Sequence, residues 1–145
     1  MKSTKLLGFA LSLASLMYLT ACDDNNDNHS NDGNVAPAGF GARTMQVTVN
    51  DGNGTFSNTG NYTLVTDGAA NATSGSYNIT GDGGTIGDSS GTWTYNRTGT
   101  NTASIVLEDS TQGTTTDDLV FDTPKTGTIT SSASGGTQNG TFSTN

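Results

Sequence analysis

Residues 91–107 read GTWTYNRTGTNTASIVL. In this stretch, bulky or apolar side chains occupy alternate positions in two short runs, at Trp93, Tyr95, Ala103, Ile105 and Leu107. A period of two is typical of a β-strand that buries one face and exposes the other. The Asn, Gly and Thr residues between the two runs suit a tight turn. The stretch therefore predicts two antiparallel strands joined by a turn.

The same alternation recurs along the chain from about Phe40 onward. It continues at Met45, Val47, Val49, Tyr62, Leu64, Tyr77, Ile79, Leu119, Phe121, Ile129 and Phe142. No segment of this region has the sustained apolar stripe of a helix. We therefore expect residues 40–145 to be all-β, an antiparallel meander of about 8–10 short strands that forms a curved sheet or a small barrel. Thr residues are expected to cover the solvated face.

The composition limits how large the core of this domain can be. Only 30% of the 145 residues are hydrophobic and only 12% are charged. Disordered chains usually combine low hydrophobicity with high charge, whereas Thr and aromatic residues favour pleated sheet. The few large apolar side chains predict a thin curved sheet or a small barrel rather than a large protein built around a cavity.

The start of the chain has the pattern of an export signal. Residues 1–22 read MKSTKLLGFALSLASLMYLTAC, with Lys2 and Lys5 before an apolar stretch at 6–19. This stretch is too short to cross a bilayer comfortably and suits the apolar region of a signal peptide. It ends in Leu-Thr-Ala-Cys22, which resembles the lipobox of bacterial lipoproteins.

This resemblance implies that residues 1–21 are removed and that Cys22 is lipidated. Fatty acyl chains such as palmitate on Cys22 would anchor the chain stably in a membrane of the cell envelope. Residues 22–39 are expected to be an acidic, Asn-rich flexible tether. Asp23 and Asp24 resemble an inner-membrane retention signal in enteric bacteria and a surface-export signal in other lineages. The sequence therefore leaves the membrane and its face open.

A second resemblance lies in the C-terminal part of the chain. Its elements are Gly-Thr-aromatic-Thr-Tyr at 91–95, Thr-Gly-x-Asn-Thr-Ala at 98–103, apolar-x-Phe at 119–121, Thr-Gly-Thr at 126–128 and Gly-Thr-Phe at 140–142. Together they resemble a β-rich meander domain of exported bacterial proteins whose function is uncharacterised. The match covers under half of the chain. It implies a β fold and brings no activity with it.

The residue inventory argues against most enzyme classes. The chain has one Cys and one His, and both precede residue 40. A domain without these residues lacks Ser-His-Asp catalysis, Cys-His catalysis and the common zinc sites. No phosphate loop or dinucleotide fingerprint occurs. The net charge of −8 repels phosphate backbones, so we expect no nucleic-acid partner. We also expect no enzymatic activity, no cofactor and no metal.

Carboxylates offer one catalytic alternative, because glycoside hydrolysis needs only two of them. The candidates are Glu108, Asp109, Asp117, Asp118 and Asp122. They flank the ends of two predicted strands, so we expect them to be solvated.

Trp93 and Tyr95 are candidate ligand contacts. Their spacing places both rings on one face of a strand, where they would stack on sugar rings or partner side chains if that face is exposed. The same spacing serves a buried core, which is the favoured interpretation. Gly91-x-Trp93 is also similar to the opening strand of lipocalins and avidins, although those families place it at the start of the barrel.

Two functions follow from these observations as expectations. The first is a membrane-anchored envelope lipoprotein with a non-enzymatic structural or interaction domain, which predicts no sizeable pocket. The alternative is a barrel that binds a small ligand or a glycan, which predicts a concave site. The expected partners are the lipid bilayer, through acylated Cys22, and an envelope protein or glycan.

Overall fold

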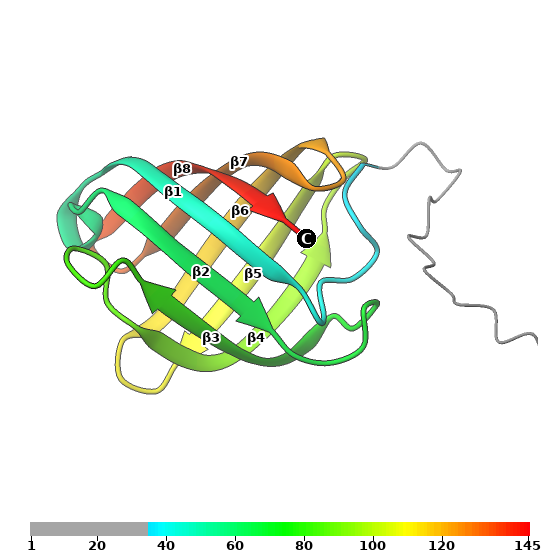
Figure 1. The fold of residues 1–145 in the computed structure, drawn as a ribbon, viewed down its shortest axis with the longest axis horizontal. Helices are drawn as coiled ribbons and strands as arrows, with labels where there is room; N and C mark the ends of the chain where they lie inside the picture. The colour runs from blue at the N-terminus through cyan, green and yellow to red at the C-terminus, as the bar shows by residue number, and fades with distance from the viewer. Residues whose placement is uncertain (1–34) are drawn as a thin grey trace, which may run out of the picture.

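The computed structural model describes residues 35–145, which form a closed barrel of eight antiparallel strands (Figure 1). The strands are β1 (Thr44–Gly52), β2 (Gly60–Thr66), β3 (Ser74–Gly81), β4 (Ser89–Arg97), β5 (Thr102–Asp109), β6 (Gly113–Thr123), β7 (Thr126–Ala133) and β8 (Gly136–Thr144). Each strand pairs with the next one in sequence, and β8 pairs with β1 to close the ring. The predicted all-β antiparallel meander is confirmed. Closure of the barrel leaves no unpaired sheet edge among the eight described strands.

The barrel interior is filled by the residues that the alternation identified. Buried side chains are Met45, Val47, Val49, Tyr62, Leu64, Tyr77, Trp93, Tyr95, Ala103, Ile105, Leu107, Leu119, Phe121, Ile129 and Phe142, with Ile79 partly buried. Their neighbours in sequence point outward, and Thr48, Thr92 and Thr128 are exposed there. The pleat therefore places one face of every strand in a single core.

Glycine makes room for aromatic rings where β6, β7 and β8 meet. Gly127 is buried and lies in register with Phe121 on one side and Phe142 on the other. A Cβ atom on Gly127 would approach the Phe142 ring to 2.9 Å, closer than atoms in contact allow. The two Phe rings meet edge to face with centroids 5.1 Å apart. A small residue in the middle strand thus allows two large side chains to share a narrow interior.

One end of the barrel is closed by the chain that precedes β1. Ala36 and Phe40 there are 0% exposed. Backbone N–H groups of Val35 and Phe40 donate to the carbonyls of Thr100 and Ala72, both at 2.8 Å. The Phe40 ring also stacks on Tyr95 with centroids 5.5 Å apart. We call residues 35–43 the plug segment.

The folded domain begins earlier in the chain than the predicted boundary between residues 39 and 40. Residues 35–39 were expected to end the flexible tether, but they pack against the barrel because an apolar run from Val35 to Phe40 covers its end. The folded domain thus includes residue 35 rather than beginning at residue 40. The predicted signal peptide, Cys22 and the rest of the tether lie outside the described residues.

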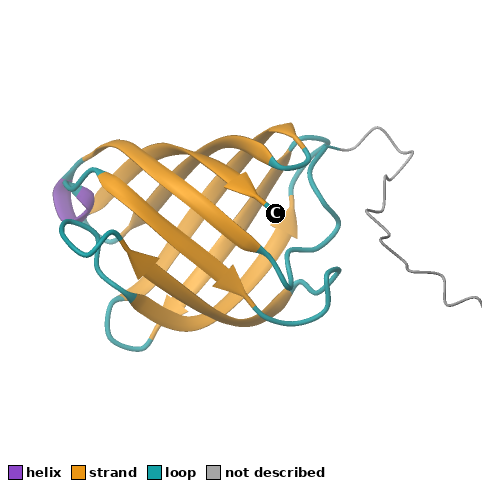
Figure 2. Cartoon of the chain, in the orientation of Figure 1, coloured by secondary structure: helices purple, strands orange, loops and turns teal. Residues whose placement is uncertain are grey.

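Helical structure within residues 35–145 amounts to one 3₁₀ turn, η1 (Gly54–Phe56), at the end of the barrel opposite the plug segment (Figure 2). The part of the chain that the structure describes contains no helix long and apolar enough to cross a membrane.

Candidate functional site

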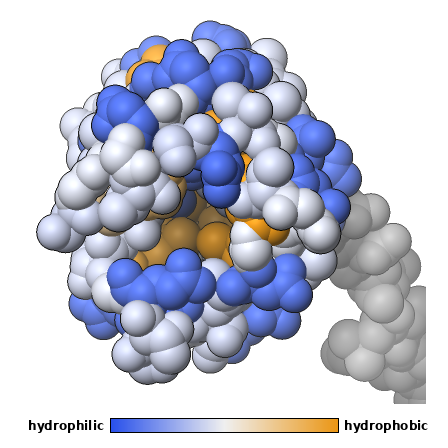
Figure 3. All heavy atoms as spheres, turned by 90° about the vertical axis from the view of Figure 1, so that its left-hand side faces the viewer, coloured by the Kyte–Doolittle hydropathy of each residue, from blue (hydrophilic) through white to orange (hydrophobic). Residues whose placement is uncertain are grey.

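The end of the barrel opposite the plug segment is hollow. A cavity of about 280 Å³ opens there between the loops that join β1 to β2, β3 to β4 and β5 to β6. Figure 3 looks into this end and shows a recess with an apolar floor surrounded by polar residues. Its apolar and aromatic lining comes from Phe56, Tyr62, Tyr77, Ile79, Ile86 and Leu107. Its polar lining includes Ser89, Asp109, Gln112, Thr115, Asp117 and Gln138.

Asp117 is the most unusual residue of the cavity lining. It lies on β6 between Ile105 of β5 and Ser131 of β7, and its side chain is 1% exposed. Neither carboxylate oxygen has a hydrogen-bond partner among residues 35–145. Burial raises the pKa of Asp117 to about 6, the nearby Ser131 hydroxyl lowers it, and the negative charge of Asp118 adds to the rise. The structure therefore holds an ionisable group in an apolar interior without an internal counter-charge.

Two hydroxyl groups accompany Asp117 inside the barrel. Ser131 is buried directly opposite it in register, and the Ser131 Oγ atom lies outside hydrogen-bond geometry with any described residue. Tyr62 comes from β2, four strands around the ring, and reaches the same region from the opposite wall. Burial, and then the charge of Asp117, raise the pKa of Tyr62 well above its usual value. Tyr62 is therefore a neutral phenol at physiological pH.

A hydrogen-bonded chain orders one side of the cavity mouth. The hydroxyls of Tyr77 and Ser89 lie 3.0 Å apart, and Ser89 Oγ donates to Asp109 at 2.7 Å. Asp109 also accepts from the hydroxyl and the backbone N–H of Thr111 and from the backbone N–H of Gln112. These donors, led by the Thr111 and Ser89 hydroxyls, hold the pKa of Asp109 well below its usual range. Asp109 is thus ionised and fixed in place.

The loop between β3 and β4 orders the other side of the mouth. The Asp82 carboxylate accepts the backbone N–H groups of residues 84–86 at 3.0–3.2 Å, which lowers its pKa. Thr85 Oγ1 donates to the Thr59 carbonyl at 2.8 Å, and Asn58 Nδ2 donates to the Thr85 carbonyl at 2.6 Å. The loops above the cavity are therefore joined by hydrogen bonds within and between them.

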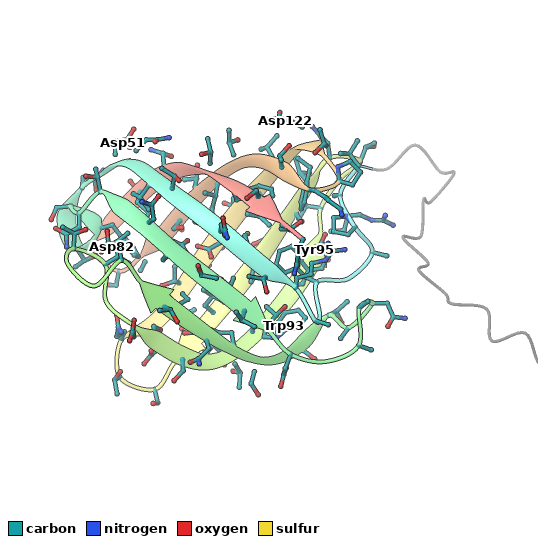
Figure 4. The ribbon with its side chains drawn as sticks, in the orientation of Figure 1. Asp51, Asp82, Trp93, Tyr95 and Asp122 are labelled. Carbon is teal, nitrogen blue, oxygen red and sulfur yellow. The ribbon has the colours of Figure 1, made fainter. Side chains whose placement is uncertain are left out.

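The candidate ligand contacts Trp93 and Tyr95 lie in the filled part of the barrel. Figure 4 shows both near the plug segment and Asp82 at the opposite end. Trp93 is 1% exposed, and Tyr95 donates a 2.6 Å hydrogen bond to the Pro37 carbonyl. Burial raises the pKa of Tyr95 to about 12. Neither residue lines the cavity.

The five candidate carboxylates separate into three environments. Glu108, Asp118 and Asp122 are exposed, as expected, and Asp109 is part of the cavity mouth. The expectation that Asp117 is solvated is wrong. Asp117 is an even number of positions from Leu119 and Phe121, so the pleat turns it inward with them. The alternation contained this signal, because extending the inward face of β6 back from Leu119 reaches Asp117.

Within residues 35–145, no group of three or more His, Cys, Asp or Glu side chains is arranged to hold a metal ion. Comparisons with protein-family models, with curated proteins and with solved structures find no match. The resemblances to lipoproteins and to an uncharacterised exported domain therefore stay predictions, and the function is argued from the cavity itself.

Proposed function

We propose that this chain is a membrane-anchored, non-enzymatic barrel that binds a small molecule in its open end. In this proposal acylated Cys22 holds the chain at a membrane of the cell envelope. The observation that carries the binding function is the buried carboxylate of Asp117, which lines an open cavity and has no partner within the described chain.

The energetic cost of Asp117 supports a functional role. Its pKa of about 6, against an ordinary value near 4, corresponds to about 3 kcal/mol lost from the folded state at neutral pH. Domains of this size have a total stability of only about 5–15 kcal/mol. An apolar residue at position 117 would avoid the loss. Residues that oppose stability in this way concentrate at functional sites.

The size and order of the cavity also support binding. An apolar cavity of about 150 Å³ holds a benzene molecule, so about 280 Å³ accommodates a substituted single ring or a short aliphatic chain. The hydrogen bonds of Asp82 and Asp109 fix the surrounding loops before a ligand arrives. Such preorganisation lowers the entropy lost on binding.

The test uses the protein purified from cells that express the full chain, with methyl groups labelled for NMR. Titration with the neutral probe benzyl alcohol should shift the methyl signals of Ile79, Ile86 and Leu107, which line the cavity, in a saturable manner. The methyl signals of Leu64 and Ile129, which are buried but do not line it, should move much less.

Thr115 provides a matched pair of variants. Its side chain lines the cavity, so Thr115→Trp should fill the space and abolish the saturable shifts. Thr114 lies beside it on β6 with an exposed side chain, so Thr114→Trp should leave binding unchanged. Absence of saturable shifts in the unaltered protein with neutral, cationic and anionic probes would refute the binding proposal and favour a structural or interaction role.

The anchor is tested separately by the substitution Cys22→Ser and fractionation of the cells. Acylation of Cys22 predicts that the unaltered protein carries added fatty acyl mass and sediments with membranes, whereas the variant does neither. A mature form that begins elsewhere than Cys22 and carries no added lipid would overturn the anchoring proposal, and the binding proposal would stand.

A further inference from the structure

We infer that the cavity selects small organic cations, with the ammonium group of a primary or secondary amine paired with Asp117 and the apolar part of the ligand filling the space toward the mouth. This inference rests on the proposed binding function and specifies its ligand class. Three features of the described residues support it: the unpartnered carboxylate, the sign of the charge around it, and the character of the walls.

The first feature is the unmet hydrogen-bonding capacity of Asp117. An ionised carboxylate only accepts hydrogen bonds, and both oxygen atoms here lack a donor among the described residues. An ammonium group carries two or three N–H donors and a positive charge, so it meets both requirements at once. Opposite charges attract far more strongly in a poorly polarisable interior than in water. A neutral alcohol offers one donor and no charge.

The second feature is the absence of positive charge from the cavity wall. No Lys or Arg among residues 35–145 lines the cavity. Arg43 lies over the Phe40 ring, and Arg97 of β4 contacts the Ala36 carbonyl. Both cations therefore lie at the plug segment, at the other end of the barrel from the cavity. The charged residues of the cavity are Asp117 on its wall and Asp109 at its mouth. This arrangement attracts cations and repels carboxylate ligands.

The third feature is the character of the remaining wall. The rings of Tyr62 and Tyr77 line the same cavity as Asp117. Aromatic rings favour cations and also pack well against apolar groups. Ile79, Ile86 and Leu107 complete a surface suited to an alkyl or aryl group. A ligand with a cationic head and a short apolar body therefore matches both the charge and the walls.

Acidification isolates the contribution of Asp117. The titratable groups that line the cavity with Asp117 are Tyr62, Tyr77 and Asp109, and its sequence neighbour Asp118 lies on the outer surface. The two Tyr residues have raised pKa values and stay neutral, and Asp109 has a lowered pKa and stays ionised. Burial gives Asp117 a pKa of about 6, so lowering the pH from 7.5 to 5 removes most of its charge.

The experiment compares benzylamine, benzyl alcohol and benzoate, which share one ring and differ in charge. Binding is followed by the methyl signals of Ile79, Ile86 and Leu107 in protein purified from cells that express the full chain. At pH 7.5 we expect benzylamine to bind at least about tenfold more tightly than benzyl alcohol, and benzoate to give no saturable shift. At pH 5 the advantage of the amine should shrink severalfold.

The variant Asp117→Asn should remove the amine advantage and leave benzyl alcohol binding within about twofold. Asp118→Asn makes the same change of charge one residue away on the outer surface. It should keep the amine advantage, which separates a specific pairing from the general attraction of an acidic protein for cations. If Asp117→Asn does not fold, the comparison of pH 7.5 with pH 5 in the unaltered protein decides the question.

The outcomes distinguish this inference from the function on which it rests. If benzyl alcohol binds in the cavity and benzylamine binds no more tightly, amine selectivity is overturned while a small-molecule barrel stands. If Asp117→Asn retains the amine advantage, the pairing with Asp117 is wrong. If no probe binds, the proposed function fails and the selectivity fails with it.

Discussion

The two ends of this barrel are made from the same alternation of inward and outward residues, yet one is filled and the other is open. At the filled end the inward positions carry large side chains such as Trp93, Tyr95 and Phe121, and Phe40 of the plug segment covers them. At the open end β6 places Thr115 and Asp117 on its inward face. Whether a barrel of this size holds a cavity therefore depends on a few inward positions near one end.

The polar groups that lack partners also differ between the two ends. The filled end leaves Trp93 Nε1 and Thr144 Oγ1 without a partner among the described residues. Both of these groups are neutral. At the open end the carboxylate of Asp117 and the hydroxyl of Ser131 lack a hydrogen-bond partner among the described residues. A buried charge costs far more than a buried neutral group. The difference indicates that the filled end contributes more to stability than the open end, where the buried carboxylate lowers it.

The largest expected effect lies at the filled end. Trp93→Ala should lower the free energy of unfolding by about 3–5 kcal/mol, because it removes a fully buried ring and leaves a cavity. Thr115→Ala, at the open end, should cost less than about 1 kcal/mol, because its side chain borders space that is already empty of protein atoms. Urea denaturation measures both. Equal losses would contradict the contrast between the ends.

An intermediate effect of opposite sign is expected for Asp117→Asn. The raised pKa means that the folded state binds the Asp117 proton more tightly than the unfolded state, so stability falls as the pH rises from about 4 through about 6. The variant should therefore be about 1–3 kcal/mol more stable than the unaltered protein at pH 7.5 and nearly equal to it at pH 4. Thermal denaturation over this pH range measures the difference.

Asp118→Asn is the control for this prediction, because its side chain is exposed on the outer face of the same strand. It should shift stability by less than about 0.5 kcal/mol at pH 7.5. A loss of stability in Asp117→Asn at neutral pH would show that Asp117 has a stabilising partner and would remove the energetic argument for a binding role.

The smallest effect compares two tyrosine hydroxyls. Tyr95→Phe removes the 2.6 Å hydrogen bond to Pro37 and leaves a partly buried carbonyl without that donor, so it should cost about 1–2 kcal/mol. Tyr62→Phe should cost less than about 0.5 kcal/mol, since Tyr62 lines the cavity at the open end. Urea denaturation of the two variants in parallel tests this ordering. A larger loss of stability in Tyr62→Phe than in Tyr95→Phe would contradict the claim that the filled end contributes more to stability.

The sequence predicted the barrel wall well, because one physical pattern specifies it. Alternation along each strand determines which side chains enter the core, and it identified the inward faces of all eight strands. Extending the same rule from Leu119 would have placed Asp117 inside. The prediction that Asp117 is solvated rested instead on its place near the end of a predicted strand, where charged residues are usually exposed.

The cavity and the plug segment were harder to predict. Whether Thr115 and Gln138 border a space depends on which strand ends share one rim of the barrel, and only the closed β1–β8 pairing determines that. Residues 35–41 form no strand, so they have no alternation to identify them. Their burial follows from contacts with Ala72 and Thr100, which are distant in sequence.

The pairing of β1 with β8 brings the beginning of the first strand beside the end of the last strand, at one end of the barrel. Thr44 and Asn145 are hydrogen-bonded to each other, so the entry and exit of the chain lie together at the end that the plug segment covers (Figure 1). In the proposed anchoring through Cys22, the tether therefore joins the domain at the end that the plug segment covers. The cavity then opens at the end of the barrel away from the attachment, and a pull along the tether meets the hydrogen bonds of Val35 with Thr100 and of Phe40 with Ala72 before the loops around the cavity.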